Sequence, residues 1–382
     1  PVSATDMPGV VELAKKLAAD LVVVAPDDPL VAGMVDALNA EGFATFGPNA
    51  AAAIIEGSKV FSKNLMLKYN IPTAEYKVFD NPCDVLTYIK EKNEFPAVIK
   101  ADGLALGKGV IIPENLEEAE KGVHEIMEDK IFGESGNHVV VEEFLTGPEV
   151  SVLAFTDGKC VKPMVSSMDH KRALDGDKGL NTGGMGTVSP NPYYTADIAK
   201  ECMEKIFLPT IDAMNKEGRT FKGCLYFGLM LTPKGPKVIE YNCRFGDPET
   251  QVVLPRLKTD IIDIFEAINS GTLAELDIEW ADEACACVIA ASGGYPKSYP
   301  KGIEITGLEN GQKDGVIVYH AGTAIKDGKL VTSGGRVLGV TALGSDLQQA
   351  LDKAYSALDE IHFDNMHFRH DIGKKALAAL NK

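Results

Sequence analysis

The sequence has no apolar run as long as a membrane-spanning helix requires, which is about 20 residues. Its strongest short run, residues 21–25, is instead typical of a buried strand. Positive charge is also scarce, because 38 Lys and Arg against 55 Asp and Glu give a formal net charge of −17. This balance argues against nucleic-acid and anionic-membrane partners, although a local basic cluster can still bind phosphate groups.

Cysteine is sparse and odd in number, with 7 cysteines in 382 residues. A disulfide framework is therefore not expected. Cys285 and Cys287 lie in an apolar run with no second pair to complete a zinc site. We therefore expect structural thiols at both positions, in a cytoplasmic protein.

Strand-like and helix-like segments alternate along the chain, which predicts an α/β protein. The length suggests two or three domains. The first part is typical of the back half of an open α/β domain: a helix over 10–18, a strand over 21–25, a turn over 26–29, a helix over 31–38 and a strand over 43–46. Because the chain begins at Pro1, we expect roughly forty to fifty residues to precede it in a complete domain.

The middle and last parts contain shorter elements. Strands are expected over 76–79, 97–100, 110–112 and 139–142, with helices over 58–69, 83–92 and 115–128. Strands over 151–155, 225–231 and 237–241 follow, and the turns at 157–158 and 233–235 indicate antiparallel pairing. The last hundred residues contain glycine-bounded strands over 315–320 and 335–342 and one long helix over 345–361.

The most informative segment covers residues 238–251. Its apolar start predicts a strand end that presents Glu240 and Asn242 on one face, because side chains alternate along a strand. Oxygen ligands in this pattern suit Mg²⁺ that is also held by nucleotide phosphates. Arg244 follows on the same face and could stabilise a developing anion. A solvated strand end with a charged turn remains an equal alternative on this segment alone.

A glycine-rich segment, residues 100–110, is the second chemical feature. Its glycines let backbone N–H groups approach phosphate oxygens, and Lys100 and Lys108 add charge. The segment is not a P-loop, because the glycine spacing is wrong, Gly109 follows the lysine and no helix comes next. A flap between two strands that closes over phosphates fits better, with a flexible hairpin as the alternative.

Two further strings carry polar groups. The string Glu142-Glu143-Phe144-Leu145, with Glu149 downstream, could provide an adenine wall and an acceptor for ribose, although most such strings are simple strand ends. The second string is Asp169-His170-Lys171-Arg172, followed by a loop over 181–186 whose backbone suits a carboxylate or phosphate. A surface histidine beside two cations is the alternative for the second string.

Together these motifs resemble the ATP-grasp superfamily and, within it, the phosphoribosylamine–glycine ligase family. The order of Gly57-Ser58-Lys59, the 98–109 segment, the Glu142 string and Glu240-x-Asn242 carries the first resemblance. The 169–172 string, the 181–186 loop and Arg244-Phe245-Gly246-Asp247-Pro248-Glu249 carry the second. The resemblance to the phosphoribosylamine–glycine ligase family covers essentially the whole chain, including residues 293–296 and 320–323.

The resemblance implies an α/β fold, α+β in parts. It would consist of an ATP-grasp core between a partial N-terminal open α/β domain and a small C-terminal mixed α/β domain. The expected bounds are 1–58, 59–270 with a flap subdomain over about 74–142, and 271–382. It also implies that ATP, glycine and 5-phosphoribosylamine give glycinamide ribonucleotide, ADP and phosphate through glycyl phosphate, the second step of purine synthesis.

The resemblance further implies roles for individual residues. ATP would be bound by Lys59, Lys100, Gly107, Lys108, Gly109, Glu142, Glu143, Phe144, Leu145 and Glu149, and Mg²⁺ or Mn²⁺ by Glu240 and Asn242. Arg244 and Lys171 would be catalytic. The two small-molecule substrates would contact Pro26, Asp169, His170, Lys171, Asn181, Thr182, Gly183, Gly184, Met185, Asp247 and Glu249. We expect a monomer or a weak homodimer.

Two departures from the family pattern concern carboxylates. A Gly-Pro-Glu turn of the family is Ala25-Pro26-Asp27-Asp28 here, which has a shorter acid. The expected strand over 226–231 offers no second carboxylate for the metal, so Asn242 and waters would complete its shell. The rival interpretations are another ATP-grasp carboxylate–amine ligase, such as a carboxylase subunit or a D-alanine ligase, and a nucleotide-binding module without turnover.

Overall fold

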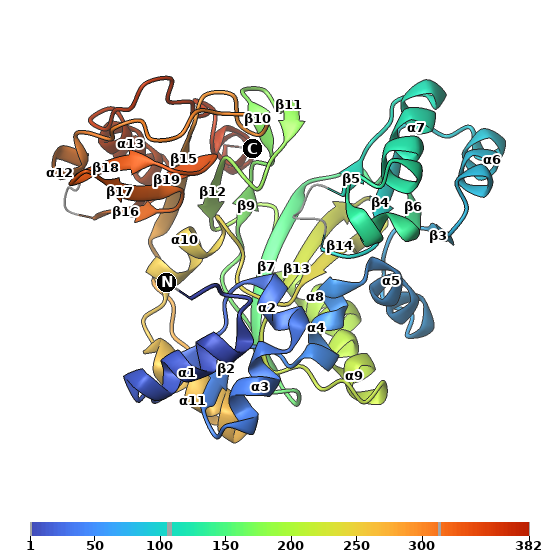
Figure 1. Cartoon of the computed structure of the whole chain (residues 1–382), viewed down its shortest axis with the longest axis horizontal. Helices are drawn as coiled ribbons and strands as arrows, with labels where there is room; N and C mark the ends of the chain where they lie inside the picture. The colour runs from blue at the N-terminus through green and yellow to red at the C-terminus, as the bar shows by residue number, and fades with distance from the viewer. Residues whose placement is uncertain (1, 105–108, 312–314, 382) are drawn as a thin grey trace.

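The computed structural model of the chain describes residues 2–104, 109–311 and 315–381. Three lobes surround a central antiparallel sheet (Figure 1). In this view the N-terminal helices lie below the sheet, the flap subdomain at the upper right and the C-terminal lobe at the upper left. Within the described residues, no helix is both long enough and apolar enough to cross a membrane.

The N-terminal lobe packs four helices around a pair of parallel strands. Its elements are α1 (Met7–Leu17), β1 (Leu21–Val23), α2 (Asp27–Ala32), α3 (Met34–Ala40), β2 (Ala44–Phe46) and α4 (Ala50–Gly57). The turn expected over 26–29 is wrong, because α2 begins at Asp27. Two acids in the first turn favour this start, since they oppose the positive end of the helix dipole. The single helix expected over 31–38 is divided at Gly33, whose φ of 97° ends α2.

The central sheet has the strand order β14-β13-β7-β8, and every pairing is antiparallel. Its strands are β7 (Glu149–Thr156), β8 (Val161–Pro163), β13 (Gly223–Thr232) and β14 (Gly235–Asn242). The antiparallel connections predicted at 157–158 and 233–235 are confirmed. Helices α5 (Lys59–Lys68), α8 (Ala196–Cys202) and α9 (Leu208–Lys216) contribute to the same lower half, and apolar side chains such as Phe207 and Phe227 fill its core.

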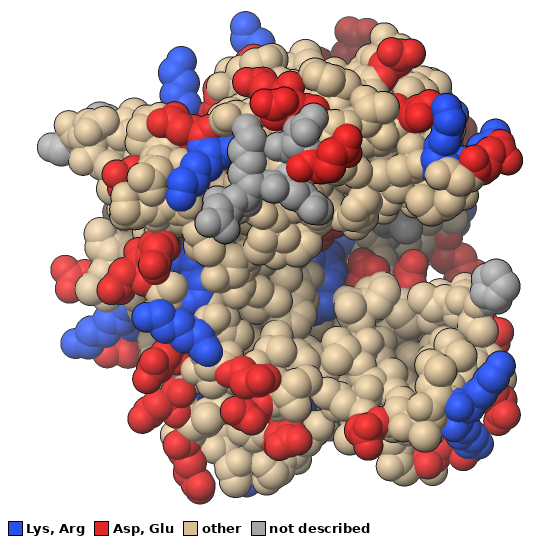
Figure 2. Space-filling view, turned by 90° about the vertical axis from the view of Figure 1, so that its left-hand side faces the viewer, with Lys and Arg blue, Asp and Glu red and all other residues tan. Residues whose placement is uncertain are grey.

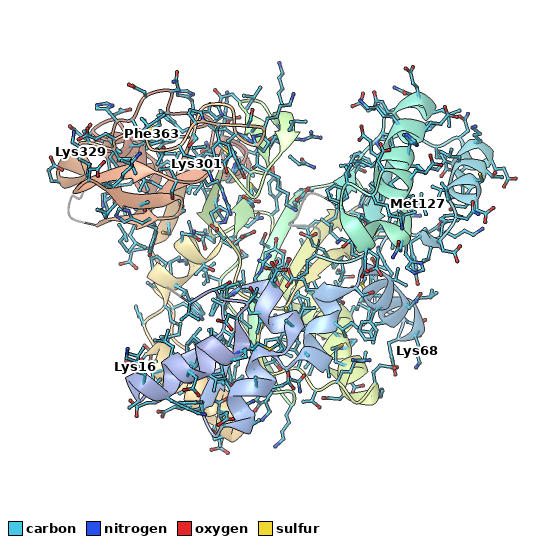
Figure 3. The ribbon with its side chains drawn as sticks, viewed as in Figure 1. Lys16, Lys68, Met127, Lys301, Lys329 and Phe363 are labelled. Carbon is cyan, nitrogen blue, oxygen red and sulfur yellow. The ribbon has the colours of Figure 1, made fainter. Side chains whose placement is uncertain are left out.

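The flap subdomain is a four-stranded antiparallel sheet with two helices. The strand order is β3-β6-β4-β5, with β3 (Tyr76–Phe79), β4 (Ala97–Ala101), β5 (Val110–Ile111) and β6 (Val139–Glu143). Helices α6 (Pro82–Lys92) and α7 (Leu116–Val123) cover one face. Figure 3 shows Met127 within this subdomain, where it belongs to a separate apolar cluster with Ile99 and Ile126.

The C-terminal lobe has a five-stranded sheet in the order β16-β19-β15-β12-β9. Two of its strands, β9 (Met168–Asp169) and β12 (Gly186–Ser189), come from the middle of the chain. The others are β15 (Ala284–Ala291), β16 (Val316–His320) and β19 (Arg336–Gly344), with α13 (Leu347–Leu358) packed against them. Cys285 and Cys287 are fully buried in β15. Because β9 and β12 border residues 169–171 and the 181–186 loop, and β9 contacts β7, the C-terminal sheet places these residues beside the central sheet.

The remaining helices and strands are shorter, and most of them lie around this sheet, whereas α11 lies beside β2 in the lower part of the molecule (Figure 1). They are the hairpins β10 (Arg172–Leu174) with β11 (Lys178–Asn181) and β17 (Thr323–Lys326) with β18 (Lys329–Thr332), and the helices α10 (Thr250–Val253), α11 (Ile261–Ser270), α12 (Leu308–Gly311) and α14 (Lys374–Leu380). Figure 3 shows Phe363 inside this lobe, where its side chain is buried.

Candidate active site

A pocket lies where α4, α5, the flap strands and the end of β14 meet. It is lined by Asp27, Ile55, Glu56, Lys59, Ser62, Lys63, Met66, Lys100, Leu104, Gly109, Val110, Glu142, Ile239, Glu240, Tyr241, Asn242 and Arg244. Figure 2 faces the side of the C-terminal and N-terminal lobes, and it shows Asp and Glu side chains over much of that face, with Lys and Arg side chains recessed between the two lobes. The lining holds four cations and four carboxylates. Its cations suit the phosphate groups of a ligand.

Glu240 and Asn242 occupy the end of β14 and line the same pocket. Burial opposes ionisation of Glu240, but nearby lysines, led by Lys171, outweigh it and hold the pKa of this carboxyl below its ordinary value. The Asn242 amide oxygen accepts a hydrogen bond from Arg244 at 3.3 Å. An ionised carboxylate beside an amide oxygen is a donor set that fits Mg²⁺ shared with phosphate oxygens. No group of three or more His, Cys, Asp or Glu among the described residues could hold a metal by itself.

Arg244 is held by acids from the N-terminal lobe. Its Nη2 lies 3.2 Å from Glu56 Oε1 and 3.9 Å from Asp27 Oδ2. The second oxygen of Glu56 accepts the backbone N–H of Cys243 at 2.7 Å, so Glu56 fixes both the side chain and the backbone at this point. Burial raises the pKa of the Glu56 carboxyl, and the charge of Arg244 opposes that shift. Sequence reasoning missed Glu56, because its partner lies far along the chain.

Lys59 and Lys100 approach the pocket from opposite sides. Lys59 Nζ donates to the carbonyl of Gly103 at 2.6 Å, which ties α5 to the glycine-rich loop. Asp102 strengthens this link, since its carboxylate accepts from the Ser58 hydroxyl and the Val60 N–H, each at 3.1 Å. Gly109 lines the pocket, whereas Gly107 and Lys108 lie outside the described residues.

Glu142 lies between two buried lysines. Its Oε1 is 2.9 Å from Lys100 Nζ, and its Oε2 is 2.9 Å from Lys63 Nζ. Lys63, which sequence reasoning missed, also donates to Thr73 Oγ1 at 2.8 Å, and burial lowers the pKa of its ammonium to about 8. Both carboxylate oxygens of Glu142 are therefore paired with cations, and its backbone lies in β6 between β3 and β4.

The other residues expected near adenine lie beyond the pocket lining. Glu143 accepts from Lys237 at 2.6 Å and from the N–H of Glu75 at 3.1 Å, so it joins β6 to β14. Phe144 is 41% exposed and Leu145 is partly buried. Glu149 Oε2 pairs with Lys171 Nζ at 3.2 Å.

Lys171 connects the pocket to a group of acids. Its Nζ lies 3.9 Å from Glu240 Oε1 in addition to its pair with Glu149, and the Glu149 charge raises its pKa well above the ordinary value. Nearby, Glu249 Oε1 accepts from the Ser151 hydroxyl at 3.3 Å. Burial and the neighbouring Glu249 charge raise the pKa of Asp169, and burial likewise raises that of Glu249. Excess carboxylates around one lysine provide a site for a cationic amino group.

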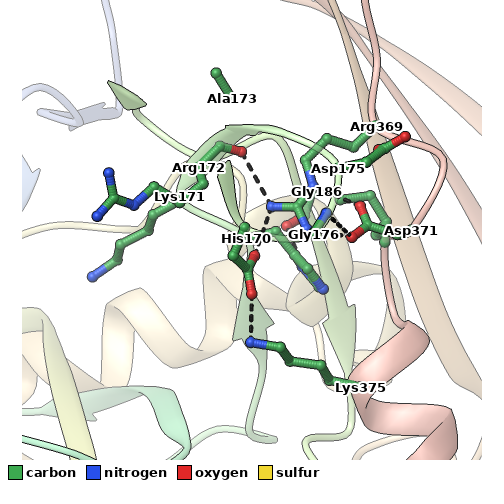
Figure 4. Close-up of polar contacts among 12 residues, drawn as sticks. His170, Lys171, Arg172, Ala173, Asp175, Gly176, Gly186, Arg369, Asp371 and Lys375 are labelled. Atoms are coloured by element: carbon green, nitrogen blue, oxygen red, sulfur yellow. Dashed lines mark hydrogen bonds and ion pairs between the residues drawn. The ribbon is translucent and has the colours of Figure 1, made fainter. Parts of the chain in front are cut away.

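The structure does not bring the His170 ring to this group. Its Nδ1 lies 3.0 Å from the carbonyl of Gly186, and its Nε2 accepts the N–H of Gly373 at 3.1 Å. Figure 4 shows the Lys171 side chain extending away from His170. Burial lowers the pKa of His170 to about 4, so the ring is neutral near pH 7. The expectation that its imidazole faces the substrate is therefore corrected to a role in binding the C-terminal segment.

The glycine loop adjoins Lys171 through its backbone. Thr182 donates from both its N–H and its hydroxyl to the carbonyl of Lys171, at 2.7 and 2.9 Å. Asn181 is exposed, and Gly183 and Gly184 follow it toward Asp247. The Met185 side chain is fully buried and faces the core, so it is not a surface for substrate. Pro26 is exposed directly before Asp27 and α2.

Comparisons with known proteins agree with this arrangement. Three family profiles match in order: the Phosphoribosylglycinamide synthetase N domain over residues 1–56, its ATP-grasp (A) domain over 57–250 and its C domain over 285–375. A phosphoribosylamine–glycine ligase of Caldanaerobacter subterraneus is 49% identical over 361 residues, which cover 94% of this chain and 86% of the relative. A trifunctional purine biosynthetic protein adenosine-3 of Gallus gallus is 51% identical over 364 residues, which cover 95% of this chain and 36% of the relative.

Solved structures show the same fold. A phosphoribosylamine–glycine ligase of Thermotoga maritima matches with a TM-score of 0.77 and 37% identity, over 86% of this chain and 81% of that one. A biotin carboxylase domain of Hydrogenobacter thermophilus, solved with MgADP and bicarbonate, matches with a TM-score of 0.73 at 16% identity. The match covers 95% of this chain and 79% of that one. The predicted α/β fold with an ATP-grasp core is confirmed, and the chain belongs to the phosphoribosylamine–glycine ligase family.

Proposed function

We propose that the chain joins glycine to 5-phosphoribosylamine at the expense of ATP, with glycinamide ribonucleotide, ADP and phosphate as products. Family membership over nearly the whole chain supports the reaction. Within the site, the position of Lys171 supports the assignment. Its Nζ lies 3.2 Å from Glu149 and 3.9 Å from Glu240, which are proposed for ATP and its metal, and it also interacts electrostatically with Asp169 and Glu249 on the other side. One side chain thus borders both halves of a two-substrate site.

ATP would enter the pocket between the flap and β14. Lys59 and Lys100 would neutralise its phosphates, Gly109 would approach them through its backbone, and Lys108 and Gly107 would complete the flap. The adenine and ribose would lie toward Glu142–Leu145 and Glu149. Glu240 and Asn242 would hold Mg²⁺ or Mn²⁺, which supplies charge that offsets the transferring phosphoryl group.

The first chemical step activates the glycine carboxylate, which is a poor electrophile. A carboxylate oxygen attacks the γ-phosphorus, the bond to ADP breaks, and glycyl phosphate forms. Such a transfer needs positioning and charge neutralisation rather than covalent help from the protein. Arg244, fixed by Glu56, would stabilise the negative charge that develops on the acyl phosphate.

The second step forms the new bond. The amine nitrogen of phosphoribosylamine attacks the acyl carbon, the carbon–oxygen bond to the phosphoryl group breaks, and phosphate leaves as the nitrogen loses a proton. Asp169, Glu249 and Lys171 would face this substrate, and Asn181–Gly184, Asp247 and Pro26 would complete its surroundings. The loop backbone would receive a carboxylate or phosphate group.

We also propose the domain bounds 1–58, 59–270, with a flap subdomain over about 74–142, and 271–382. The flap has its own apolar cluster, which supports treating it as a separate subdomain. A monomer or weak homodimer in the cytoplasm, without nucleic-acid or membrane partners, fits the seven free cysteines and the net charge of −17.

Release of phosphate tests the function. With ATP and Mg²⁺, the purified protein should release phosphate only when glycine and phosphoribosylamine are both present. Equal release with bicarbonate or D-alanine in place of glycine would assign the chain to another carboxylate–amine ligase. ATP binding without turnover under any of these conditions would favour a nucleotide-binding module.

A further inference from the structure

Arg336 of the C-terminal lobe reaches the two segments that border the acidic group. It is the first residue of β19, and its Nη1 donates to the carbonyl of Gly183 at 2.7 Å and to the carbonyl of Asp247 at 2.9 Å. Its Nη2 forms an ion pair with Asp247 Oδ2 at 2.7 Å. One guanidinium therefore joins the glycine loop to the turn that leads into Glu249.

The glycines of the loop are required for this contact. A Cβ atom on Gly183 would lie 2.9 Å from Arg336 Cζ, closer than a real Cβ contact allows. Gly184 has a φ of +112°, and a Cβ there would lie 2.4 Å from Pro248 and 2.7 Å from Asp169 Oδ1. The two glycines thus form a thin layer between the guanidinium on one side and Pro248 with Asp169 on the other.

A second contact from the same lobe supports the loop. The hydroxyl of Tyr295 accepts the N–H of Gly183 at 3.1 Å. Gly335, directly before Arg336, leaves room for this ring, because a Cβ there would lie 2.2 Å from Tyr295 Cδ2. The loop is therefore fixed by a side chain at its carbonyl and by another at its N–H.

We propose that Arg336 is a positioning residue that sets the distance between Asp169 and Glu249, and thereby the affinity for the ammonium group of glycine. This inference rests on the proposed function. Glycine is the substrate concerned because its ammonium keeps its charge, whereas phosphoribosylamine must offer an uncharged nitrogen to attack. Buried carboxylates stabilise a cation and do not favour a free amine.

The test compares Arg336→Ala and Arg336→Lys with wild type in steady-state kinetics. In Arg336→Ala the KM for glycine should rise about tenfold or more, because three charge-assisted contacts to Gly183 and Asp247 are lost. The KM values for ATP and phosphoribosylamine should stay within about twofold. Lysine offers one point charge instead of a planar fork of donors. The KM for glycine of Arg336→Lys should therefore lie between the values of wild type and Arg336→Ala. Lys329→Ala is the matched control, since Lys329 is exposed in the same lobe and pairs with Glu304 at 2.7 Å.

A folded Arg336→Ala enzyme with an unchanged KM for glycine would overturn the inference, and so would equal increases in all three KM values. If Arg336→Ala does not fold, Gly183→Ala decides, because its methyl group displaces the guanidinium and should produce the same selective increase. A wild-type protein that shows no turnover with glycine and phosphoribosylamine would instead contradict the proposed function.

Discussion

The guanidinium of Arg244 lies 3.2 Å from the Glu56 carboxylate, so a residue at the end of the central sheet is oriented by the last turn of α4. Glu56→Gln removes the charge but keeps an oxygen for the Cys243 N–H. We expect kcat to fall about tenfold or more, because an unanchored arginine stabilises the developing anion less well. Steady-state phosphate release measures this, with Glu41→Gln as a control for an exposed acid of the same lobe. An unchanged kcat in a folded variant would remove Glu56 from the site.

Glu142 should be important for stability as well as for ATP binding. Glu142→Ala leaves Lys63 and Lys100 buried without their anionic partner, a change that costs about 3–5 kcal/mol in comparable pairs. Urea unfolding measures the loss. Glu217→Ala breaks the more exposed pair with Lys68 and should lower the free energy of unfolding far less, because solvent screens that pair. Equal losses in the two variants would mean that the buried lysines find other partners.

Glu240→Ala should lower turnover by about two or more orders of magnitude while the protein stays folded, because the proposed Mg²⁺ site would lose its carboxylate. The measurement is turnover as a function of Mg²⁺ concentration, with removal of the metal by EDTA as the reference. The exposed Glu304→Ala serves as the control. Near-normal turnover of Glu240→Ala at saturating Mg²⁺ would place the metal elsewhere.

His170 should make stability depend on pH. The pKa of its ring is about 4 in the folded protein and about 6.5 when unfolded, so only the unfolded chain gains a proton between these values. The free energy of unfolding should therefore fall as pH drops from about 6.5 to 4, by up to about 3 kcal/mol from this group. In His170→Gln this part of the pH dependence is lost.

Urea unfolding at several pH values checks this, and His362→Gln is the control at an exposed position. The difference in stability between wild type and His170→Gln should shrink as the pH falls. A constant difference from pH 7 to pH 4 would mean that the ring gains a proton in the folded protein as easily as in the unfolded chain.

Local periodicity predicted part of the site from sequence. Glu240, Asn242 and Arg244 were expected on one face, and all three line the pocket, because alternation along a strand needs only neighbouring residues. The same alternation separates His170 from Asp169 and Lys171, so a signal for the buried position of His170 is present in the sequence. The start of α2 at Asp27 was missed because a proline-rich turn and a helix N-terminus share their residue types.

Long-range contacts could not be predicted in this way. Glu56, Lys63 and Arg336 are ordinary charged residues in the sequence, and their roles arise only when distant segments pack together. The same holds for β9 and β12, whose membership in the C-terminal sheet depends on pairing with β15 and with each other. Sequence patterns specify the faces of elements, whereas the partners of those faces depend on the whole fold.

In the proposed reaction, glycine is activated as an acyl phosphate before the amine of phosphoribosylamine attacks it. Glycine labelled with ¹⁸O in its carboxylate tests this most directly, with mass spectrometry of the phosphate released in a complete reaction. Each released phosphate should carry one ¹⁸O, because the attacking carboxylate oxygen leaves with the phosphoryl group. Phosphate without label, formed together with the ligated product, would contradict this prediction.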